Sequence, residues 1–277
     1  LATVNAGSGN VTLNSAGAIV DDGSSGTVIT GGVLTADAAG AITIDSTVTS
    51  ANISTSAAGA VDLDETDAIT LTDVDTNDGS ITVDAGGLIT ATDVVASGGS
   101  GDSVTLSTTT GGAVATLVTG ADAVSITANA GDITIGSVTA TAGTLGVTAT
   151  AGSINDAADD NTADFTAGGL ITLTAQDEVG VLGSGSDLDL EFAAGSSVNV
   201  STTGTGAIDL DGLGALTLID VDTVNGAITA SSAGALTVTD VASGTNGNIV
   251  LSTSSGDITG LATVNAGSGN VTLNSAG

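Results

Sequence analysis

Residues 71–94, LTDVDTNDGSITVDAGGLITATDV, and residues 218–241, LIDVDTVNGAITASSAGALTVTDV, align without a gap and are identical at 13 of 24 positions. Within the first stretch the dipeptide Asp-Val returns after twenty residues, at 73–74 and 93–94, and the second stretch repeats the same step. A fixed internal period is the signature of a repeat architecture. The sequence therefore predicts a fold assembled from units of about 20 residues.

A much longer period is superimposed on the short one. Residues 1–17, LATVNAGSGNVTLNSAG, return unchanged as residues 261–277, which lies 260 residues further along the chain. We therefore expect 1–277 to be a single continuous repeat segment, in which 261–277 repeats 1–17. We also expect it to be taken from a longer array.

Short alternations of apolar and polar residues recur between turn residues throughout the chain. Examples are VTL at 11–13, VDL at 61–63 and ITV at 81–83. Strict alternation marks a strand with one buried face, and Asp, Asn and Gly between such segments favour turns. No segment has the pattern of a long helix, so the sequence predicts an all-β protein.

Two or three short strands in a unit of about 20 residues match one coil of a β-solenoid, whose coils stack at about 4.8 Å. The predicted fold is therefore a parallel β-helix with about 20 residues per coil. A row of β-sandwich domains is the alternative. Sandwich domains usually have an aromatic core, whereas this chain has two Phe and no Trp, Tyr or Pro, which favours the solenoid.

The composition excludes several classes of partner. The chain has no Lys, Arg, His or Cys, and its 31 Asp and Glu residues give a net charge of −31. Such a surface repels nucleic acids and anionic membranes, and no run approaches the ~18 apolar residues of a membrane span. We expect no nucleic-acid partner, no membrane insertion and no ion pair between side chains.

The run GDITIGSVTATAGTLGVTATAGSI at 131–154, with phrases of the form G-x-I-T-L-x-A-x-G elsewhere, resembles the repeat regions of filamentous-haemagglutinin-like adhesins. It is also similar to very large bacterial surface exoproteins of the β-strand-repeat type. The resemblance covers essentially the whole chain. It implies a right-handed, three-sided β-helix that projects from the cell surface as a fibre, and hence an extracellular location. The absence of Lys and Arg departs from the haemagglutinin repeats.

Catalysis is not expected, because carboxylates are the only conventional catalytic groups that this composition leaves. Pairs at i and i+2, such as Asp62/Asp64 and Asp187/Asp189, share one face of a strand. Two carboxylates can hydrolyse a glycoside. Such sites normally also use aromatic or basic residues to hold the sugar, so we expect no enzyme.

Calcium is the one ligand that the sequence suggests. Asp side chains stacked coil over coil place like charges about 5 Å apart, which is costly unless they are solvated, protonated or bridged by a cation. Ca²⁺ prefers oxygen ligands of this kind. A solvated acidic face that keeps the fibre soluble is the alternative. The two candidate metal stacks are formed by Asp73, Asp75 and Asp93, and by Asp220, Asp222 and Asp240.

A pair of Thr columns offers another interpretation. Thr70 and Thr72 recur as Thr90 and Thr92, and flat Thr arrays on β-solenoids resemble ice-binding faces. Thr is also the favoured exposed residue of any strand. The second explanation is simpler, so ice binding is a minor alternative.

The sequence thus predicts a stiff, acidic, non-catalytic segment of an extracellular fibre or matrix filament. Its partners are expected to be the continuation of its own chain and other copies lying along or beside the fibre. The alternative is the passive stalk of a large bacterial adhesin, serving biofilm or cell attachment, whose binding tip lies elsewhere. No cofactor is expected apart from the possible Ca²⁺.

Overall fold

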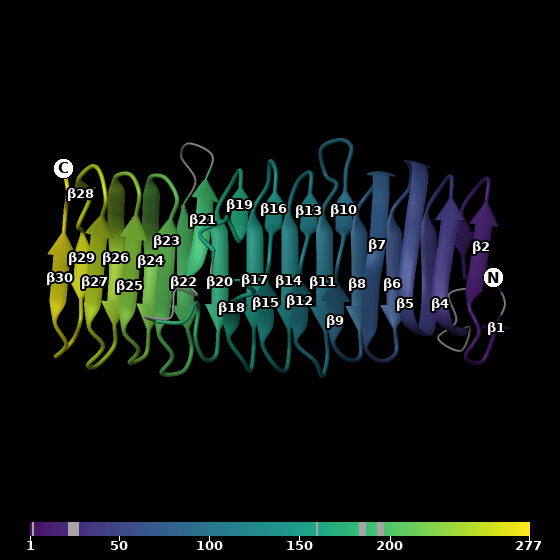
Figure 1. Ribbon diagram of the computed structural model, residues 1–277, viewed down its shortest axis with the longest axis horizontal. Coiled ribbons are helices and arrows are strands. Elements are labelled where there is room, and N and C mark those ends of the chain that lie inside the picture. Colours follow the sequence, from purple (N-terminus) through teal and green to yellow (C-terminus); the bar gives the residue numbers. More distant parts are fainter. Residues whose placement is uncertain (2, 22–27, 159, 183–186, 193–196) are drawn as a thin grey trace.

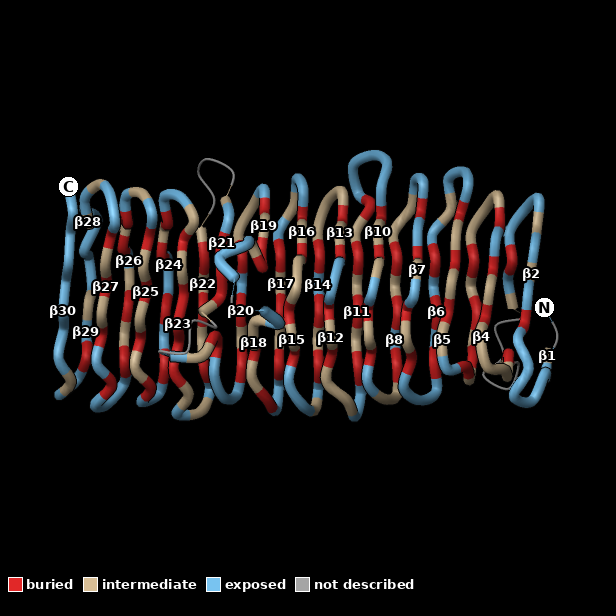
Figure 2. Tube along the Cα trace, viewed as in Figure 1, coloured by how far each residue is buried: buried red, intermediate tan, exposed pale blue. Residues whose placement is uncertain are grey.

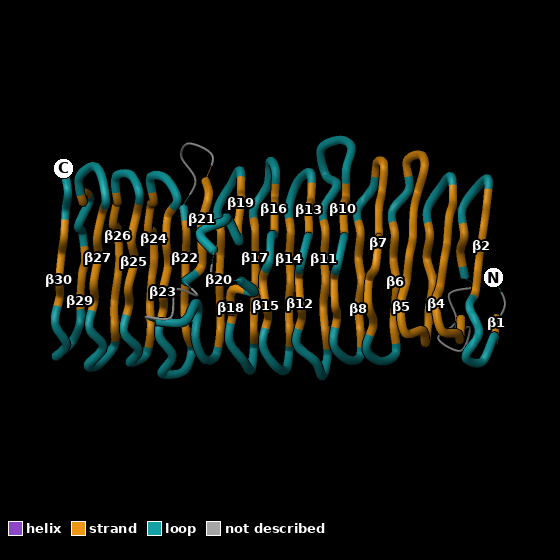
Figure 3. The backbone as a smooth tube through the Cα atoms, viewed as in Figure 1, coloured by secondary structure: helices purple, strands orange, loops and turns teal. Residues whose placement is uncertain are grey.

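The computed structural model describes residues 1–277 except 2, 22–27, 159, 183–186 and 193–196. Its regular structure is all β-strand and contains no helix (Figure 3). Figure 1 shows an elongated rod in which the strands run across the long axis and the two ends of the chain lie at opposite ends. The chain is a parallel β-solenoid of about 12 turns with about 21 residues per turn, so the predicted fold class is confirmed.

The strands belong to one sheet that continues along the whole rod. In chain order they are β1 (Val4–Asn5), β2 (Val11–Ser15), β3 (Ile19–Val20), β4 (Ile29–Ala38), β5 (Ile42–Ala58), β6 (Val61–Glu65), β7 (Ile69–Asp78), β8 (Ile81–Ala85), β9 (Ile89–Ala91), β10 (Val94–Ala96), β11 (Val104–Thr108), β12 (Ala113–Ala115), β13 (Val118–Gly120), β14 (Val124–Ala128), β15 (Ile133–Ile135), β16 (Val138–Ala140), β17 (Leu145–Ala149), β18 (Ile154–Asp156), β19 (Phe165–Ala167), β20 (Ile171–Ala175), β21 (Leu188–Phe192), β22 (Val198–Thr202), β23 (Ile208–Gly212), β24 (Leu216–Thr223), β25 (Ile228–Ser232), β26 (Leu236–Ser243), β27 (Ile249–Thr253), β28 (Ile258–Thr259), β29 (Thr263–Asn265) and β30 (Val271–Asn274).

In the middle of the rod each turn contributes three short strands, and each strand pairs in parallel with the one three places further along. The first ladder runs through β8, β11, β14, β17 and β20. The second runs through β9, β12, β15 and β18, and the third through β10, β13, β16 and β19. The expected three sides are therefore present here as three ladders, while the right-handed sense of winding stays a prediction.

The length of a turn varies although the ladders stay in register. Val104 pairs with Val124, which is the step that the sequence repeat predicts. The steps from Leu145 to Ile171 and from Ile171 to Val198 are clearly longer. In this ladder β17, β20 and β22 have five residues each, so the additional residues lie in the rest of each turn. The widest turns of the rod are therefore those between β17 and β22.

The core is a single cluster of apolar side chains that runs the length of the rod. It follows from the alternation along each strand, because every second residue points inward and stacks on its counterpart in the next turn. Leu106, Ile126, Val147 and Leu173 form one such stack and are buried. Figure 2 shows the resulting alternation of buried and more exposed residues. Phe165 is among the largest fully buried side chains.

Buried hydroxyls hold the corners at which strands end. The Oγ1 of Thr202 donates to the carbonyl of Gly206 at 3.1 Å, and that of Thr253 donates to the carbonyl of Gly256 at 2.8 Å. These Thr side chains occupy core-facing positions, yet their polar atom is satisfied locally by the turn that follows. The same contact recurs at Thr55, Thr76 and Thr108, with the carbonyls of Gly59, Gly79 and Gly111.

The two identical 17-residue segments pair on opposite sides. In the first copy Val11 pairs with Leu34 of the following turn, and in the second copy Val271 pairs with Ile249 of the preceding turn. Val271 and Leu273 are each 44% exposed at the outer edge of β30.

Nothing in the described part of the chain forms a helix with the length and apolarity that a membrane span requires.

Candidate functional site

The structure brings the first predicted group of carboxylates together near one column of the solenoid. Asp73 and Asp75 lie on β7, and Asp93 lies one turn further, immediately before β10. Asn52 precedes them in the column, pairing with Asp73, and its amide lies 3.5 Å from a carboxylate oxygen of Asp73. Burial, followed by the charge and a hydrogen bond of Asp73 and the charge of Asp93, raises the pKa of Asp75 to about 6.

The second predicted group has the same arrangement. Asp220 and Asp222 lie on β24, and Asp240 on β26 pairs directly with Asp220. Asn199 occupies the position that Asn52 has in the first group, because it pairs with Asp220. Burial raises the pKa of Asp222 to about 6, together with a hydrogen bond to Asp220 and the charges of Asp220 and Asp240.

A β-bulge explains why the two sites look alike. The register shifts between Ala51 and Asn52, so that Thr72 is an additional residue on its strand. An equivalent shift between Val198 and Asn199 leaves Ile219 additional. A bulge redirects the side chains that follow it, and here both bulges come directly before the first Asp of the group. The alignment of 71–94 with 218–241 therefore reflects a shared local structure.

Three buried oxygens in these two columns lack a hydrogen-bond donor. Among the described residues, the buried side-chain atoms without any partner are Oδ1 of Asp93, Oδ1 of Asn199 and Oδ1 of Asp240. Buried oxygens of native proteins are nearly always paired with protein or with ordered water. The two columns are thus places where a water molecule or a cation would complete the contacts.

A third carboxylate cluster lies elsewhere in the rod. Asp187, Asp189 and Asp211 each offer a carboxylate oxygen, and these oxygens lie within 4.8 Å of one another. Asp189 is on β21 and pairs with Asp211 on β23, while Asp187 lies two residues before Asp189. The sequence shows Asp187 and Asp189 as a pair on one face of a strand. The contribution of Asp211 could have been found from the second D-L-D motif of this region, at 209–211.

One member of this cluster, Asp189, is more buried than any carboxylate of the predicted columns. Asp189 is 4% exposed and Asp164 is 2% exposed. The backbone N–H of Asp189 donates to Oδ2 of Asp164 at 2.9 Å, and the backbone N–H of Asp164 donates to the carbonyl of Asp189 at 3.0 Å. Burial raises the pKa of Asp164 to about 9, and Asp156 and Asp189 add to the shift.

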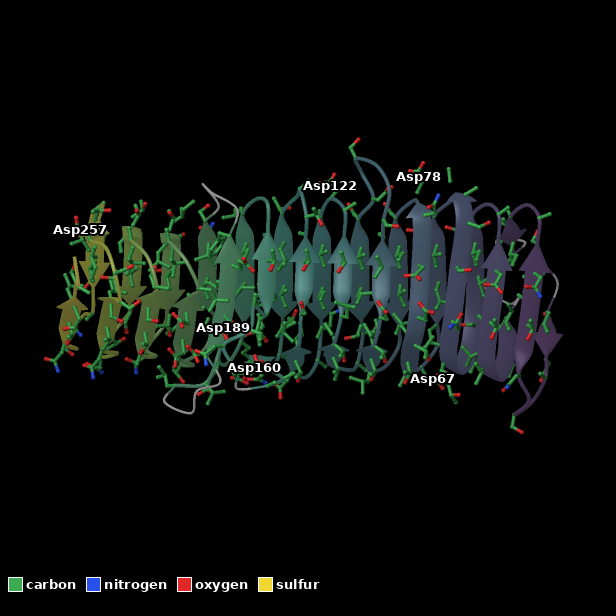
Figure 4. The ribbon with its side chains drawn as sticks, turned by 45° about the horizontal axis from the view of Figure 1, so that its top comes forward. Asp67, Asp78, Asp122, Asp160, Asp189 and Asp257 are labelled. Carbon is green, nitrogen blue, oxygen red and sulfur yellow. The ribbon has the colours of Figure 1, made fainter. Side chains whose placement is uncertain are left out.

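Other carboxylates surround Asp189. Burial raises its pKa to about 7, and the charges of Asp187, Asp211, Asp156 and Asp160 raise it further, in that order. Figure 4 shows Asp160 and Asp189 near one another beside the middle of the rod, whereas Asp67, Asp78, Asp122 and Asp257 are spread along its edges.

A surface groove lies beside β5, β7 and β9. It has a volume of about 540 Å³ and is lined mainly by Thr, Val, Ile and Leu side chains and by glycines. Its one carboxylate belongs to Asp67. Glycoside hydrolysis needs two carboxylates, so this lining lacks the required pair.

The predicted Thr array extends over two turns. Thr70 pairs with Thr90, but the next residue in that column is Val114. Thr72 is the additional residue at the bulge, and Thr92 lies in the bend between β9 and β10. The array is therefore interrupted by a side chain of different chemistry.

A scan against protein-family models and searches among curated proteins and solved structures give no match to this chain. The β-solenoid architecture is thus established, while the resemblance to filamentous-haemagglutinin-like adhesins stays a prediction.

Proposed function

We propose that this chain is a structural, non-catalytic segment of an extracellular fibre. The observation that supports the proposal is the unbroken parallel pairing from β1 to β30 around one apolar core. The ladder hydrogen bonds run along the axis of the rod, so stretching or bending requires many of them to break together. Such a rod is stiff because each turn is held by both of its neighbours.

The proposal includes a continuation of the rod by further copies of the same period. The first copy of the 17-residue segment pairs with the turn after it, and the second copy pairs with the turn before it. Overlaying the two copies gives one turn with a partner on both sides, in the register already seen at Val11 and Val271. With about 12 turns stacked at ~4.8 Å, one chain adds roughly 58 Å to such a fibre.

The acidic exterior fits a fibre that must stay dispersed outside the cell. A net charge of −31 without any Lys, Arg or His makes neighbouring rods repel each other in the absence of cations. Divalent cations would weaken this repulsion and let rods associate side by side. A passive adhesin stalk is the second candidate, and the resemblance of sequence pattern favours it.

Electron microscopy of the native material on and around its cells tests the proposal. Free fibres many micrometres long, especially in bundles, are expected for a matrix or filament protein. Single rods of uniform length, rooted at the cell surface and ending in a distinct tip, would assign the segment to a stalk instead. Short globular particles would contradict both.

Calcium binding at the two predicted columns is a separate proposal, favoured by the orphaned oxygens of Asp93 and Asp240. The expected result is a rise in the melting temperature on adding Ca²⁺ that becomes smaller in the double variant Asp93→Asn, Asp240→Asn. An equal rise in the parent chain and the variant would show that these columns hold water rather than calcium.

A further inference from the structure

Asp189 is deeply buried, and none of the described residues donates a hydrogen bond to its carboxylate. The residue is 4% exposed, and its carboxylate accepts no hydrogen bond from the described residues, since the contact to Asp164 uses the backbone N–H of Asp189. A buried carboxylate without donors is costly, because desolvation of the charge is not repaid. The cost of this charge is relieved either by a proton or by a bound cation.

The polypeptide contains no basic side chain that could pair with this charge. Lys, Arg and His are absent from the entire sequence, and the charged groups that act on Asp189 are further carboxylates. Asp211 lies opposite it in the ladder and Asp187 lies on the same strand. The three carboxylates therefore lie close together. Other acidic residues, in contrast, are spread along the edges of the rod (Figure 4).

We propose that Asp187, Asp189 and Asp211 form a specific Ca²⁺ site in the side of the solenoid. Their oxygens lie within 4.8 Å of one another, so a single ion between them contacts all three. Ca²⁺ binds oxygen at about 2.3–2.6 Å and therefore bridges oxygens up to roughly 5 Å apart. Mg²⁺, at about 2.0–2.1 Å, needs them within roughly 4.2 Å, and it requires a stricter octahedral geometry. The spacing thus favours Ca²⁺.

The position of the site gives it a structural role. It links β21 to β23, beside the two long turns that separate Leu145 from Ile171 and Ile171 from Val198. Longer corners cost more entropy to close. An ion that binds residues of two successive turns would hold this widened part of the rod in the same register as the regular turns on either side.

The test uses isothermal titration of the full chain with CaCl2 in about 0.15 M KCl, which screens diffuse binding to the acidic surface. We expect one ion per chain to bind before any weaker sites fill. The variants Asp211→Asn and Asp189→Asn should weaken this binding by roughly tenfold or more, because ligand charge sets Ca²⁺ affinity.

The matched control is the double variant Asp62→Asn, Asp64→Asn. These two residues are also two positions apart on a strand, but both are exposed on β6, so the variant changes the net charge without touching the site. It should keep the stoichiometric site, as should the column variant Asp93→Asn, Asp240→Asn. Equal loss of binding in the control and in Asp211→Asn would overturn the proposal, and so would a titration without any saturable site.

Thermal unfolding provides the second measurement and guards against a folding defect. Asp189→Asn removes a buried charge but keeps the shape of the side chain, so its melting temperature without calcium should equal or exceed that of the parent. The rise that calcium causes in the parent should be absent or clearly smaller in the variant. A variant that still gains as much stability from calcium as the parent would contradict the site.

Discussion

At the scale of single residues, Glu65 shows how this chain satisfies a buried carboxylate without a cation. Glu65 is 4% exposed, and its Oε2 accepts the hydroxyl of Ser46 at 2.6 Å and the backbone N–H of Val48 at 3.0 Å. Burial raises the pKa of Glu65, and these hydrogen bonds partly oppose the shift. The donors replace the basic partner that the composition does not supply.

Substitutions at Glu65 should separate the value of the charge from that of the acceptor. Glu65→Gln keeps an acceptor for Ser46 and Val48, whereas Glu65→Leu leaves both donors unpaired and should lose about 1–3 kcal/mol. Because the folded pKa is raised, the ionised wild-type side chain costs stability as pH rises above the ordinary value of 4.5. The stability of Glu65→Gln relative to wild type should therefore increase from pH 4 to pH 8.

Urea unfolding followed by circular dichroism at several pH values gives these free energies. Equal losses for Glu65→Gln and Glu65→Leu at pH 5 would show that the acceptor contributes nothing. A difference between Gln and wild type that does not change with pH would show that Glu65 is not perturbed.

At the scale of elements, the corners depend on close contact between glycines of successive turns. A Cβ atom at Gly226 would overlap the carbonyl oxygen of Gly206, and one at Gly247 would overlap that of Gly226. The corner is also held by Ser243, whose hydroxyl donates to the carbonyl of Gly226 at 3.0 Å and accepts the N–H of Gly247 at 3.0 Å. The backbones therefore approach too closely for any side chain.

Gly226→Ala should destabilise the rod by about 1–3 kcal/mol, the usual cost of forcing additional atoms into a packed site. Gly214 is the matched control, because a Cβ there has no neighbour within 4 Å. Gly214→Ala should be neutral or slightly stabilising, since it restricts the unfolded chain. Midpoints of chemical unfolding measure both, and similar midpoints for the two variants would contradict the stacking argument.

The sequence predicted the elements well because each strand is encoded locally. The alternation at 81–83 and at 61–63 became β8 and β6, and the twenty-residue step became the ladder register. Turn length was less predictable, because corner residues are not periodic. The two long turns, which end at Ile171 and at Val198, could not be inferred from the regular step of the repeat.

The candidate sites, too, could be predicted only where they follow the twenty-residue repeat. The two predicted columns follow from the twenty-residue step, which places Asp220 beside Asp240. The bulges that precede them leave no signal in composition. The role of Asp211 was missed because the spacing between the D-L-D motifs at 187–189 and 209–211 departs from that step. The burial of Asp189 was missed because its place in the alternation of the strand predicts a side chain that points outward. The sequence pattern does not show that this position is covered.

At the scale of the whole molecule, the raised pKa values add up in one direction. Burial and neighbouring carboxylates raise the pKa of Asp75 and Asp222 to about 6 and that of Asp164 to about 9. The pKa of Asp64 is raised as well, by burial and then by Asp62, Asp45 and Asp84. The exposed Asp160 shows the opposite shift in its pKa, because Thr162 donates to it. The balance is therefore strongly toward groups that hold protons in the folded state.

We predict that the rod becomes more stable on acidification from about pH 9 to about pH 5. A carboxyl whose pKa is higher in the folded than in the unfolded state binds more protons when folded, so the free energy of unfolding falls as pH rises between the two pKa values. The window begins near the ordinary pKa of 3.8 and extends to about 9, the value for Asp164. Most proteins instead lose stability in acid, because their carboxylates are paired with cations.

Melting temperatures measured with a chelator present, at intervals from pH 5 to pH 9, test the sign of this pH dependence. Added salt should reduce the loss of melting temperature at high pH, because it screens the repulsion among the 31 acidic side chains. A melting temperature that falls steadily from pH 7 to pH 5 would mean that the carboxylates are stabilised in their charged form by contacts that this structure does not contain.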